Sequence, residues 1–211
     1  MDGQLIDSKQ EVSTWDNYKI TFDSYQDYLE KKGGCKRDLN FIDLLYASNY
    51  KGGSGSIQED LFKPENKAKL NLYSALLKEI DESFKDTDLR NVDASGLVKL
   101  TNYADRMITL CSECHIKGLG VPYCSALFHL QFPNLFPVID RNVLLGIGDI
   151  IKMDNIQKSG QIWKIERHYI SLIGKLYDYV QKHEKSLRDA DKDLFDKGKV
   201  TYEEYKQQNK P

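Results

Sequence analysis

The sequence predicts an all-α protein, and two observations point to this class. Apolar residues recur at spacings of three and four along most of the 211-residue chain, which is the pattern of amphipathic helices. The only alternation typical of a strand is Tyr18, Ile20 and Phe22, which is too short to be convincing. Hydrophobic residues make up 40% of the chain and charged residues 29%, a globular composition.

The first half of the chain contains three predicted helices. Residues 22–32 form one, which Gly33 and Gly34 end because glycine readily adopts the left-handed turn that closes a helix. The segments RDLNFIDLLYASNY and KAKLNLYSALLKEIDESF each carry an apolar stripe. Between them, KGGSGS predicts a flexible loop, and Pro64 suits the first turn of the next helix.

Three more helices are predicted in the second half, besides a helix over 122–130 that is described below. Asp93, Ala94 and Ser95 supply an N-cap region for a helix over residues 97–115. A long helix is expected over 159–185, with Glu166 at the edge of its apolar stripe. The sequence TYEE, which starts at Thr201, matches a capping box and predicts a short last helix.

The net charge and the N-terminal sequence limit the functional classes to which the protein can belong. The net charge of −2 gives no overall positive field, so nucleic-acid binding would have to rest on a local patch. The start, MDGQLIDSKQ, lacks the basic and apolar regions of a signal peptide, and no stretch approaches the ~20 apolar residues of a membrane span. We therefore expect an intracellular protein, in the cytoplasm or the nucleus, with its four cysteines reduced and no membrane partner.

Two interpretations compete for the stretch CSECHIKGLG. Its first half, Cys111 to His115, has the spacing of a c-type haem attachment site, but such attachment needs export. Zinc is also disfavoured, because the cysteines do not form two properly spaced pairs. Cys111 and Cys114 instead continue a helical apolar stripe, as buried free cysteines do, so we expect neither a metal nor another cofactor.

The second half of that stretch predicts a helix, a tight turn and another helix. Gly118 and Gly120 supply the turn, and Pro122 suits the first turn of a helix over 122–130. Without side chains at the two glycines, the backbone can approach a phosphate, which the N–H groups that open the second helix would bind. Lys117 adds a positive charge, although many glycine turns between helices bind nothing.

The continuation VPYCSALFHLQFPNLFPVIDRNVLLGIG, together with this turn, resembles the helix-hairpin-helix DNA glycosylase superfamily. In that family a turn of the form L-P-G-[VI]-G is followed by a helix and then by a catalytic aspartate. Here the turn is Ile116 to Gly120, and Asp140 in FPVIDRNV lies twenty positions after Gly120, the family's typical separation. The resemblance is clear over residues 97–148.

The resemblance implies a two-lobed helical fold over residues 1–211, with the lobes sharing a cleft, and duplex DNA with a damaged or modified base as partner. It implies base excision, in which the carboxylate of Asp140 stabilises positive charge on the sugar or activates water. Pro122 stands where family members that also cut the backbone carry a lysine, and no cysteine follows Cys124, so neither lyase activity nor an iron-sulfur cluster is expected. The residues expected to contact DNA are Lys117, Gly118, Leu119, Gly120, Val121, Tyr123 and Arg141.

Several alternatives stay open from the sequence. Asp140 has the position of an N-cap for the helical run RNVLLGI, a role compatible with catalysis. Arg141 is either a phosphate contact or the ion-pair partner of Asp140. Aromatic candidates for a base pocket are Tyr123, His129, Phe132, Phe136, Trp163 and Tyr169. The rival function is a DNA-binding or structural protein that uses the same fold without catalysis.

Overall fold

The computed structural model describes residues 14–52, 57–151, 155–157 and 161–208, and these form eight α-helices. No strand forms within these ranges, where the only β-type pairing is an isolated bridge between Ile156 and Ile162. The all-α prediction is therefore confirmed for the described chain. In order, the helices are α1 (Thr14–Lys32), α2 (Phe41–Tyr50), α3 (Pro64–Phe84), α4 (Ala94–Glu113), α5 (Val121–Gln131), α6 (Arg141–Ile147), α7 (Tyr169–His183) and α8 (Leu187–Gln208).

Local capping explains where several of these helices begin. The Asn40 side chain accepts a hydrogen bond from the backbone N–H of Ile42, and the Asp43 carboxylate accepts one from the N–H of Asn40. Asp93 caps α4 by accepting from the N–H of Gly96, and a proline opens α3. Each cap satisfies a backbone donor that the first turn leaves unpaired.

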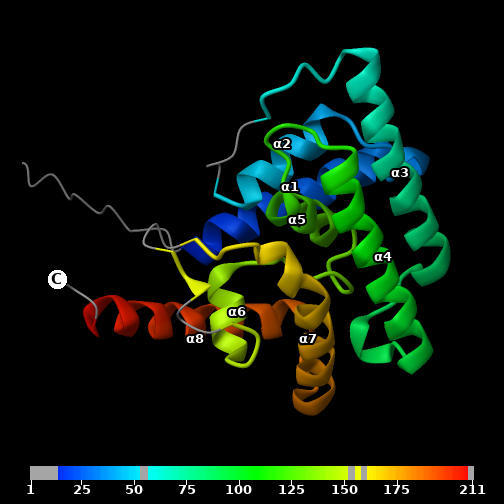
Figure 1. Cartoon of the computed structure of the whole chain (residues 1–211). Coiled ribbons are helices and arrows are strands. Elements are labelled where there is room, and N and C mark those ends of the chain that lie inside the picture. Colours follow the sequence, from blue (N-terminus) through cyan, green and yellow to red (C-terminus); the bar gives the residue numbers. More distant parts are fainter. Residues whose placement is uncertain (1–13, 53–56, 152–154, 158–160, 209–211) are drawn as a thin grey trace, which may run out of the picture.

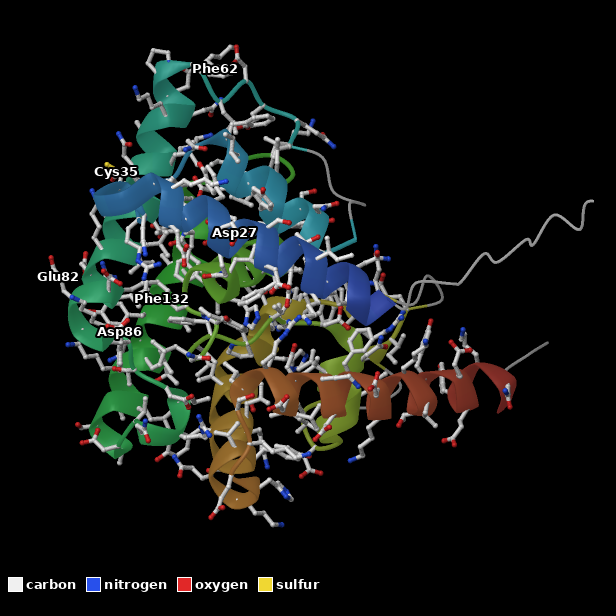
Figure 2. The ribbon with its side chains drawn as sticks, turned by 180° about the vertical axis from the view of Figure 1, so that it is seen from behind. Asp27, Cys35, Phe62, Glu82, Asp86 and Phe132 are labelled. Carbon is white, nitrogen blue, oxygen red and sulfur yellow. The ribbon has the colours of Figure 1, made fainter. Side chains whose placement is uncertain are left out.

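Helix α5 lies at the centre of the molecule. Every residue from Cys124 to Gln131 is buried, and α1, α2 and α4 all pack against the helix. Helices α3 and α4 run side by side along one edge, while α6, α7 and α8 gather at the opposite end from α2 (Figure 1). Seen from behind, α1 crosses the molecule above α8 (Figure 2).

Helices α6 and α8 cross with their backbones almost touching. A Cβ atom at Gly198 would lie 1.7 Å from the carbonyl oxygen of Asn142, and one at Gly146 would lie 2.0 Å from that of Leu194. These overlaps are impossible for any residue with a side chain. The two glycines therefore fix α8 against α6, while the last turns of α8 project beyond it (Figure 1).

Two sequence-based predictions of elements were wrong, and a third helix is longer than predicted. The helix predicted over residues 22–32 begins at Thr14, so Tyr18, Ile20 and Phe22, whose alternation was too short to predict a strand, lie in α1. The helix predicted over 159–185 begins only at Tyr169, because Lys164 takes a left-handed conformation and a 3-10 turn (Ile165–His168) follows. Glu166 therefore lies before the helix. Ser159 falls outside the described residues. Thr201 does not start a helix but lies inside α8, where its hydroxyl donates to the carbonyl of Lys197.

Of the predicted loop KGGSGS, only Lys51 and Gly52 are described, and they form a turn after α2. The stretch MDGQLIDSKQ, which was predicted not to be a signal peptide, lies outside the described ranges. Among the helices that are described, none combines the length and the apolar character needed to cross a bilayer.

Candidate functional site

The turn between α4 and α5 has the hairpin geometry that its glycines predict. Gly118 has a φ of +96°, a conformation that L side chains rarely adopt. Gly120 has a φ of −82° and is the N-cap of α5, with no side chain available to cap the helix. The N–H of Leu119 donates to the carbonyl of Ile116 at 2.8 Å, which closes the turn.

The hairpin is held from outside by two contacts from the segment that leads into α3 and from α3 itself. The N–H of Gln58 donates to the carbonyl of Lys117 at 2.9 Å, and Lys69 Nζ donates to that of His115 at 2.7 Å. The Leu119 and Val121 side chains are buried beneath the turn. Leu119 and Val121 were predicted to contact DNA, but because their side chains are buried they could offer a ligand only backbone atoms. The Lys117 side chain, by contrast, is exposed.

A groove of about 570 Å³ runs from the start of α5 to the start of α6. It brings together three of the predicted site residues, Tyr123, Asp140 and Arg141, whereas the residues from Lys117 to Val121 are not part of its lining. The groove is lined by Tyr18, Lys51, Pro122, Tyr123, Ile139, Asp140, Arg141, Asn142, Gln161, Ile162, Ile165 and Phe195.

Both oxygens of the Asp140 carboxylate are engaged. Oδ1 accepts the backbone N–H of Asn142 at 2.8 Å and so caps α6, while Oδ2 lies 2.9 Å from Lys51 Nζ. Burial opposes the charged form, but the Lys51 ammonium, the Asn142 N–H and the nearby Arg141 outweigh it and lower the pKa of Asp140. The carboxylate is therefore charged at neutral pH, and it retains 25% side-chain exposure toward the groove.

Lys51, and not Arg141, is the ion-pair partner of Asp140. Lys51 follows α2, and its Nζ also reaches the carbonyl of Ile139 at 3.3 Å. The Arg141 guanidinium instead stacks on the Tyr202 ring of α8 at 3.8 Å from the ring centroid. Arg141 thus stays in the groove wall and contributes to the positive potential around Asp140.

A small cavity of about 20 Å³ adjoins the groove behind Asp140. The two share four residues, which places Asp140 and Lys51 at their junction; the cavity is lined by Tyr18, Tyr50, Lys51, Val138, Asp140, Val143, Asp191 and Phe195. Asp191 and Phe195 come from α8, which lies far outside the segment 97–148 that carries the resemblance. Sequence reasoning missed both residues; Asp191, for example, stands in a run of charged residues of a kind that normally faces solvent.

Asp191 is buried, and its Oδ1 has no hydrogen-bond partner. Burial raises the pKa of Asp191 to about 7, with the charge of Asp140 adding to the rise and Arg188 and Lys51 opposing it. The site therefore contains two carboxyl groups of opposite tendency, one held charged and one close to half-protonated at neutral pH.

Arg188 and His129 complete the polar cluster on the inner side of the cavity. An Arg188 Nη donates to the hydroxyl of Tyr50, and the ring of His129 lies 5.6 Å from that of Tyr50. His129 Nδ1 is 2.8 Å from the carbonyl of Phe136, while its Nε2 has no partner. Burial and the nearby Arg188 lower the pKa of His129 to about 4, so the ring is neutral.

Most aromatic candidates for a base pocket are core residues. His129, Phe136 and Tyr169 are completely buried, and the Tyr169 hydroxyl donates to the carbonyl of Pro137. Trp163 is 57% exposed and lies outside the groove, although its neighbours Ile162 and Ile165 line it. Of the six candidates only Tyr123 lines the groove; Phe132 lines a different hollow, and the aromatic walls that the sequence missed are Tyr18 and Phe195.

The hydrophobic interpretation is confirmed for Cys111 but not for Cys114, which is only partly buried. Cys111 is buried on α4 and its Sγ lies 2.7 Å from that of Cys124 on α5, so it faces across the hairpin and not toward Cys114. Cys114 is the C-cap of α4, and His115 is exposed. Within the described ranges no three histidine, cysteine or acidic side chains are placed to hold a metal ion.

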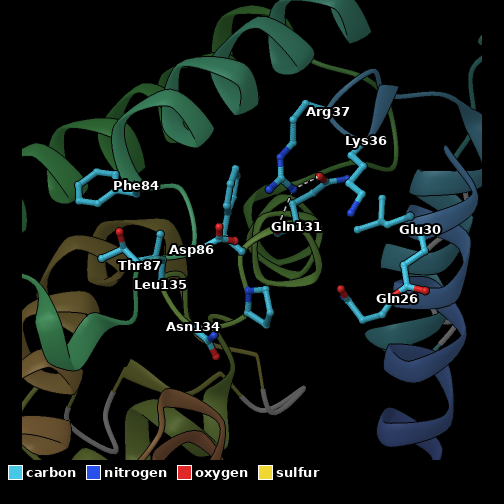
Figure 3. Close-up of a pocket in the computed structure, with 13 residues that line it drawn as sticks. Gln26, Glu30, Lys36, Arg37, Phe84, Asp86, Thr87, Gln131, Asn134 and Leu135 are labelled. Atoms are coloured by element: carbon cyan, nitrogen blue, oxygen red, sulfur yellow. Dashed lines mark hydrogen bonds between the residues drawn. The ribbon is translucent and has the colours of Figure 1, made fainter. Parts of the chain in front are cut away.

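A second hollow, of about 250 Å³, lies between α1, the end of α3 and the segment after α5 (Figure 3). Of its two basic residues, Lys36 and Arg37, Arg37 donates to Asp81 through Nε and Nη2 and to Gln131 through Nη1, and stacks on Phe132 at 4.0 Å. All three guanidinium nitrogens of Arg37 are therefore hydrogen-bonded to other residues of the fold. The hollow includes neither the hairpin nor Asp140.

Comparison of the chain with protein-family models, with curated proteins and with solved structures finds no match.

Proposed function

We propose that the protein binds duplex DNA through the hairpin and excises a damaged or modified base, with Asp140 as the catalytic carboxylate. We further propose that the fold is of the helix-hairpin-helix glycosylase type, with the groove as the cleft between two lobes. The observation that carries the proposal is that the charged carboxylate of Asp140 and the first turn of α5 line one groove. A cation that develops on the sugar would be stabilised by such a carboxylate.

The aromatic walls of the groove suit a nucleotide that has been turned out of the duplex. Tyr18, Tyr123 and Phe195 line the space on which a base could stack. Phosphate binding would use the backbone N–H groups of the turn that opens α5, where the absence of a side chain at Gly120 leaves the approach unobstructed. Because Pro122 supplies no amine, the product would be an intact strand with an abasic site.

One observation favours the rival function. Asp140 caps α6 and pairs with Lys51, so both of its oxygens have a structural use without any substrate. A DNA-binding protein that does no chemistry would need these contacts equally. Excision would use the charge of the carboxylate and its unused lone pairs, and the following experiments separate the two functions.

Excision is tested with duplexes that carry uracil, hypoxanthine, 8-oxoguanine or an alkylated purine, by counting strand breaks after alkali. We expect breaks with wild type, no breaks without alkali, and no borohydride-trapped complex. Asp140→Asn should keep the cap and most DNA affinity but lose at least about a hundredfold in rate, since the charge is removed. Asp93→Asn is the matched control, because Asp93 is also an N-cap but starts α4 and does not line the groove.

Tight DNA binding by wild type without release of any tested base would favour the non-catalytic function. Full activity of Asp140→Asn would remove Asp140 from the mechanism.

The hairpin is tested at Gly120, which offers a cleaner change than Gly118. A Cβ atom at Gly120 would meet only Pro122 Cδ, at 3.9 Å, and its φ is negative, so Gly120→Val should fold. The new side chain would hold a phosphate away from the backbone, and we expect DNA affinity to be lost in a filter-binding or anisotropy assay. A folded Gly120→Val protein with wild-type affinity would exclude the hairpin as the binding element.

A further inference from the structure

The cavity behind Asp140 contains a second carboxyl group with unused hydrogen-bonding capacity. Asp191 is 4% exposed, and its Oδ1 is one of the few buried polar atoms without a partner in the described chain. Buried polar atoms of native proteins are nearly always hydrogen-bonded, to protein or to water. The cavity volume of about 20 Å³ suits one water molecule, which the Asp191 oxygen would bind.

The two carboxyl groups differ in how well they could take a proton. Asp140 is stabilised in its charged form by Lys51 and the Asn142 N–H, which makes it a weak base. The pKa of Asp191, raised to about 7 by burial, is close to the value that makes a carboxylate an efficient base at neutral pH.

The charged and titratable groups that face Asp191 come from each helix around the cavity. Arg188 on α8 and Lys51 after α2 favour its ionised form, and Asp140 opposes it. The hydroxyls of Tyr18, Tyr50 and Tyr169 lie within its electrostatic reach, and each has a raised pKa and is neutral at pH 7, first because of burial.

We propose that Asp191 is the general base of the reaction and that Asp140 stabilises the sugar cation, so that two carboxyl groups divide the work. This inference rests on the proposed excision. The bond from C1′ to the base nitrogen breaks and its electron pair leaves with the base, which takes a proton from solvent. The oxygen of the water in the cavity bonds to C1′, and the proton that this water loses passes to the Asp191 carboxylate.

A pH dependence follows from this division. Asp191 must be ionised to accept the proton, so base release should rise as pH increases through about 7. Between pH 6 and pH 8 the expected increase is about tenfold, the change in the ionised fraction of one such group. Asp140 is already charged over this range and contributes no pH dependence of its own.

The first arm of the test needs no substrate. Carboxyl carbon resonances of the full chain, labelled at aspartate, are titrated by NMR in wild type and variants. We expect one resonance with a midpoint near 7 that disappears in Asp191→Asn, moves to lower pH in Asp140→Asn, and moves to higher pH in Lys51→Met. Asp196→Asn is the control, because Asp196 lies on the same helix but is exposed and paired with Lys192. A midpoint below about pH 5, or one that ignores Asp140, would overturn the proposal.

The second arm measures base release between pH 5.5 and 8.5 on whichever duplex of the panel wild type cleaves. Asp191→Asn should lose the rise with pH and at least about a hundredfold in rate at pH 8, while Asp191→Glu should recover a rise with a shifted midpoint. Wild-type activity with an unchanged profile in Asp191→Asn would overturn this proposal and leave excision standing. Failure of wild type to release any base would overturn both, whereas the NMR arm alone can fail only the Asp191 proposal.

Discussion

The groove beside Asp140 and the hollow beside Arg37 each contain an ion pair between residues far apart in the sequence, Lys51–Asp140 and Arg37–Asp81. The two regions differ in how much of their hydrogen-bonding capacity is left unused. In the hollow, the Arg37 guanidinium bonds to Asp81 and Gln131 and stacks on Phe132. In the groove and its cavity, a buried Asp191 oxygen remains without a partner. A saturated ion pair such as Arg37–Asp81 links segments of a fold, whereas a buried carboxyl oxygen without a partner keeps binding capacity for a ligand.

We expect the largest destabilisation of the protein when α8 is removed from the wall of the groove. Gly198→Val would place a side chain on the carbonyl of Asn142, so α6 and α8 could not stay packed, and we expect a loss of at least about 4 kcal/mol in the free energy of unfolding. Urea unfolding measures it. Gly174→Ala, in α7 with open space around its Cβ, is the control and should be neutral or slightly stabilising.

Hydrogen exchange should show where the Gly198→Val damage lies. Amides of α6 and α8 should lose protection, while those around the Arg37 hollow keep it. Equal loss at both places would contradict the separation of the two regions.

Substitution of Asp191 should change the free energy of unfolding in the opposite direction. Its folded pKa of about 7 lies above the unfolded value, so the native state is most favoured at low pH and loses stability as pH rises toward 7. Asp191→Asn removes the buried charge and should stabilise the protein by about 4 kcal/mol at pH 8 and by less than about 1 kcal/mol at pH 4. Thermal unfolding at both pH values measures this, and a destabilised Asp191→Asn protein at pH 8 would show that the ionised carboxyl has a partner.

The saturated pair should respond in the opposite way. Arg37→Met leaves Asp81 and the Gln131 carbonyl without their donor, and we expect a loss of about 2 kcal/mol, discounted because the Asp81 carboxylate is partly exposed. Base release and DNA affinity should not change, because the hollow is separate from the groove. Chemical denaturation and the alkali assay on one preparation check both statements.

The smallest expected effect is at Lys117. Its exposed side chain has no structural role that the hairpin depends on, so Lys117→Ala should change stability by less than about 0.5 kcal/mol. DNA affinity should fall modestly, and the slope of affinity against salt concentration should decrease by about one phosphate contact. An unchanged salt slope would mean that Lys117 makes no phosphate contact.

How far the sequence predicted the molecule follows from the range of the forces involved. Caps and turns are local, so Asp93, Pro64 and the Gly118 turn were recognisable from neighbouring residues alone. The full length of α8 was not, because Gly198 normally weakens a helix and is tolerated here only through its contact with α6. Likewise, the left-handed Lys164 that delays α7 has no local signal.

The candidate site shows the same limit. Asp140 and Tyr123 could be named because a motif carries them, but Lys51 reaches Asp140 from 89 positions away. Whether Asp191 faces solvent or the interior is decided by tertiary packing, which a run of charged residues conceals.

The separation between Lys51 and Asp140, and the 138 positions between Tyr50 and Arg188, also bear on the kinetics of folding. Contacts between such distant segments require large loops to close before any interaction energy is gained, so they form late. Substitutions around the groove should then accelerate unfolding more than they slow folding.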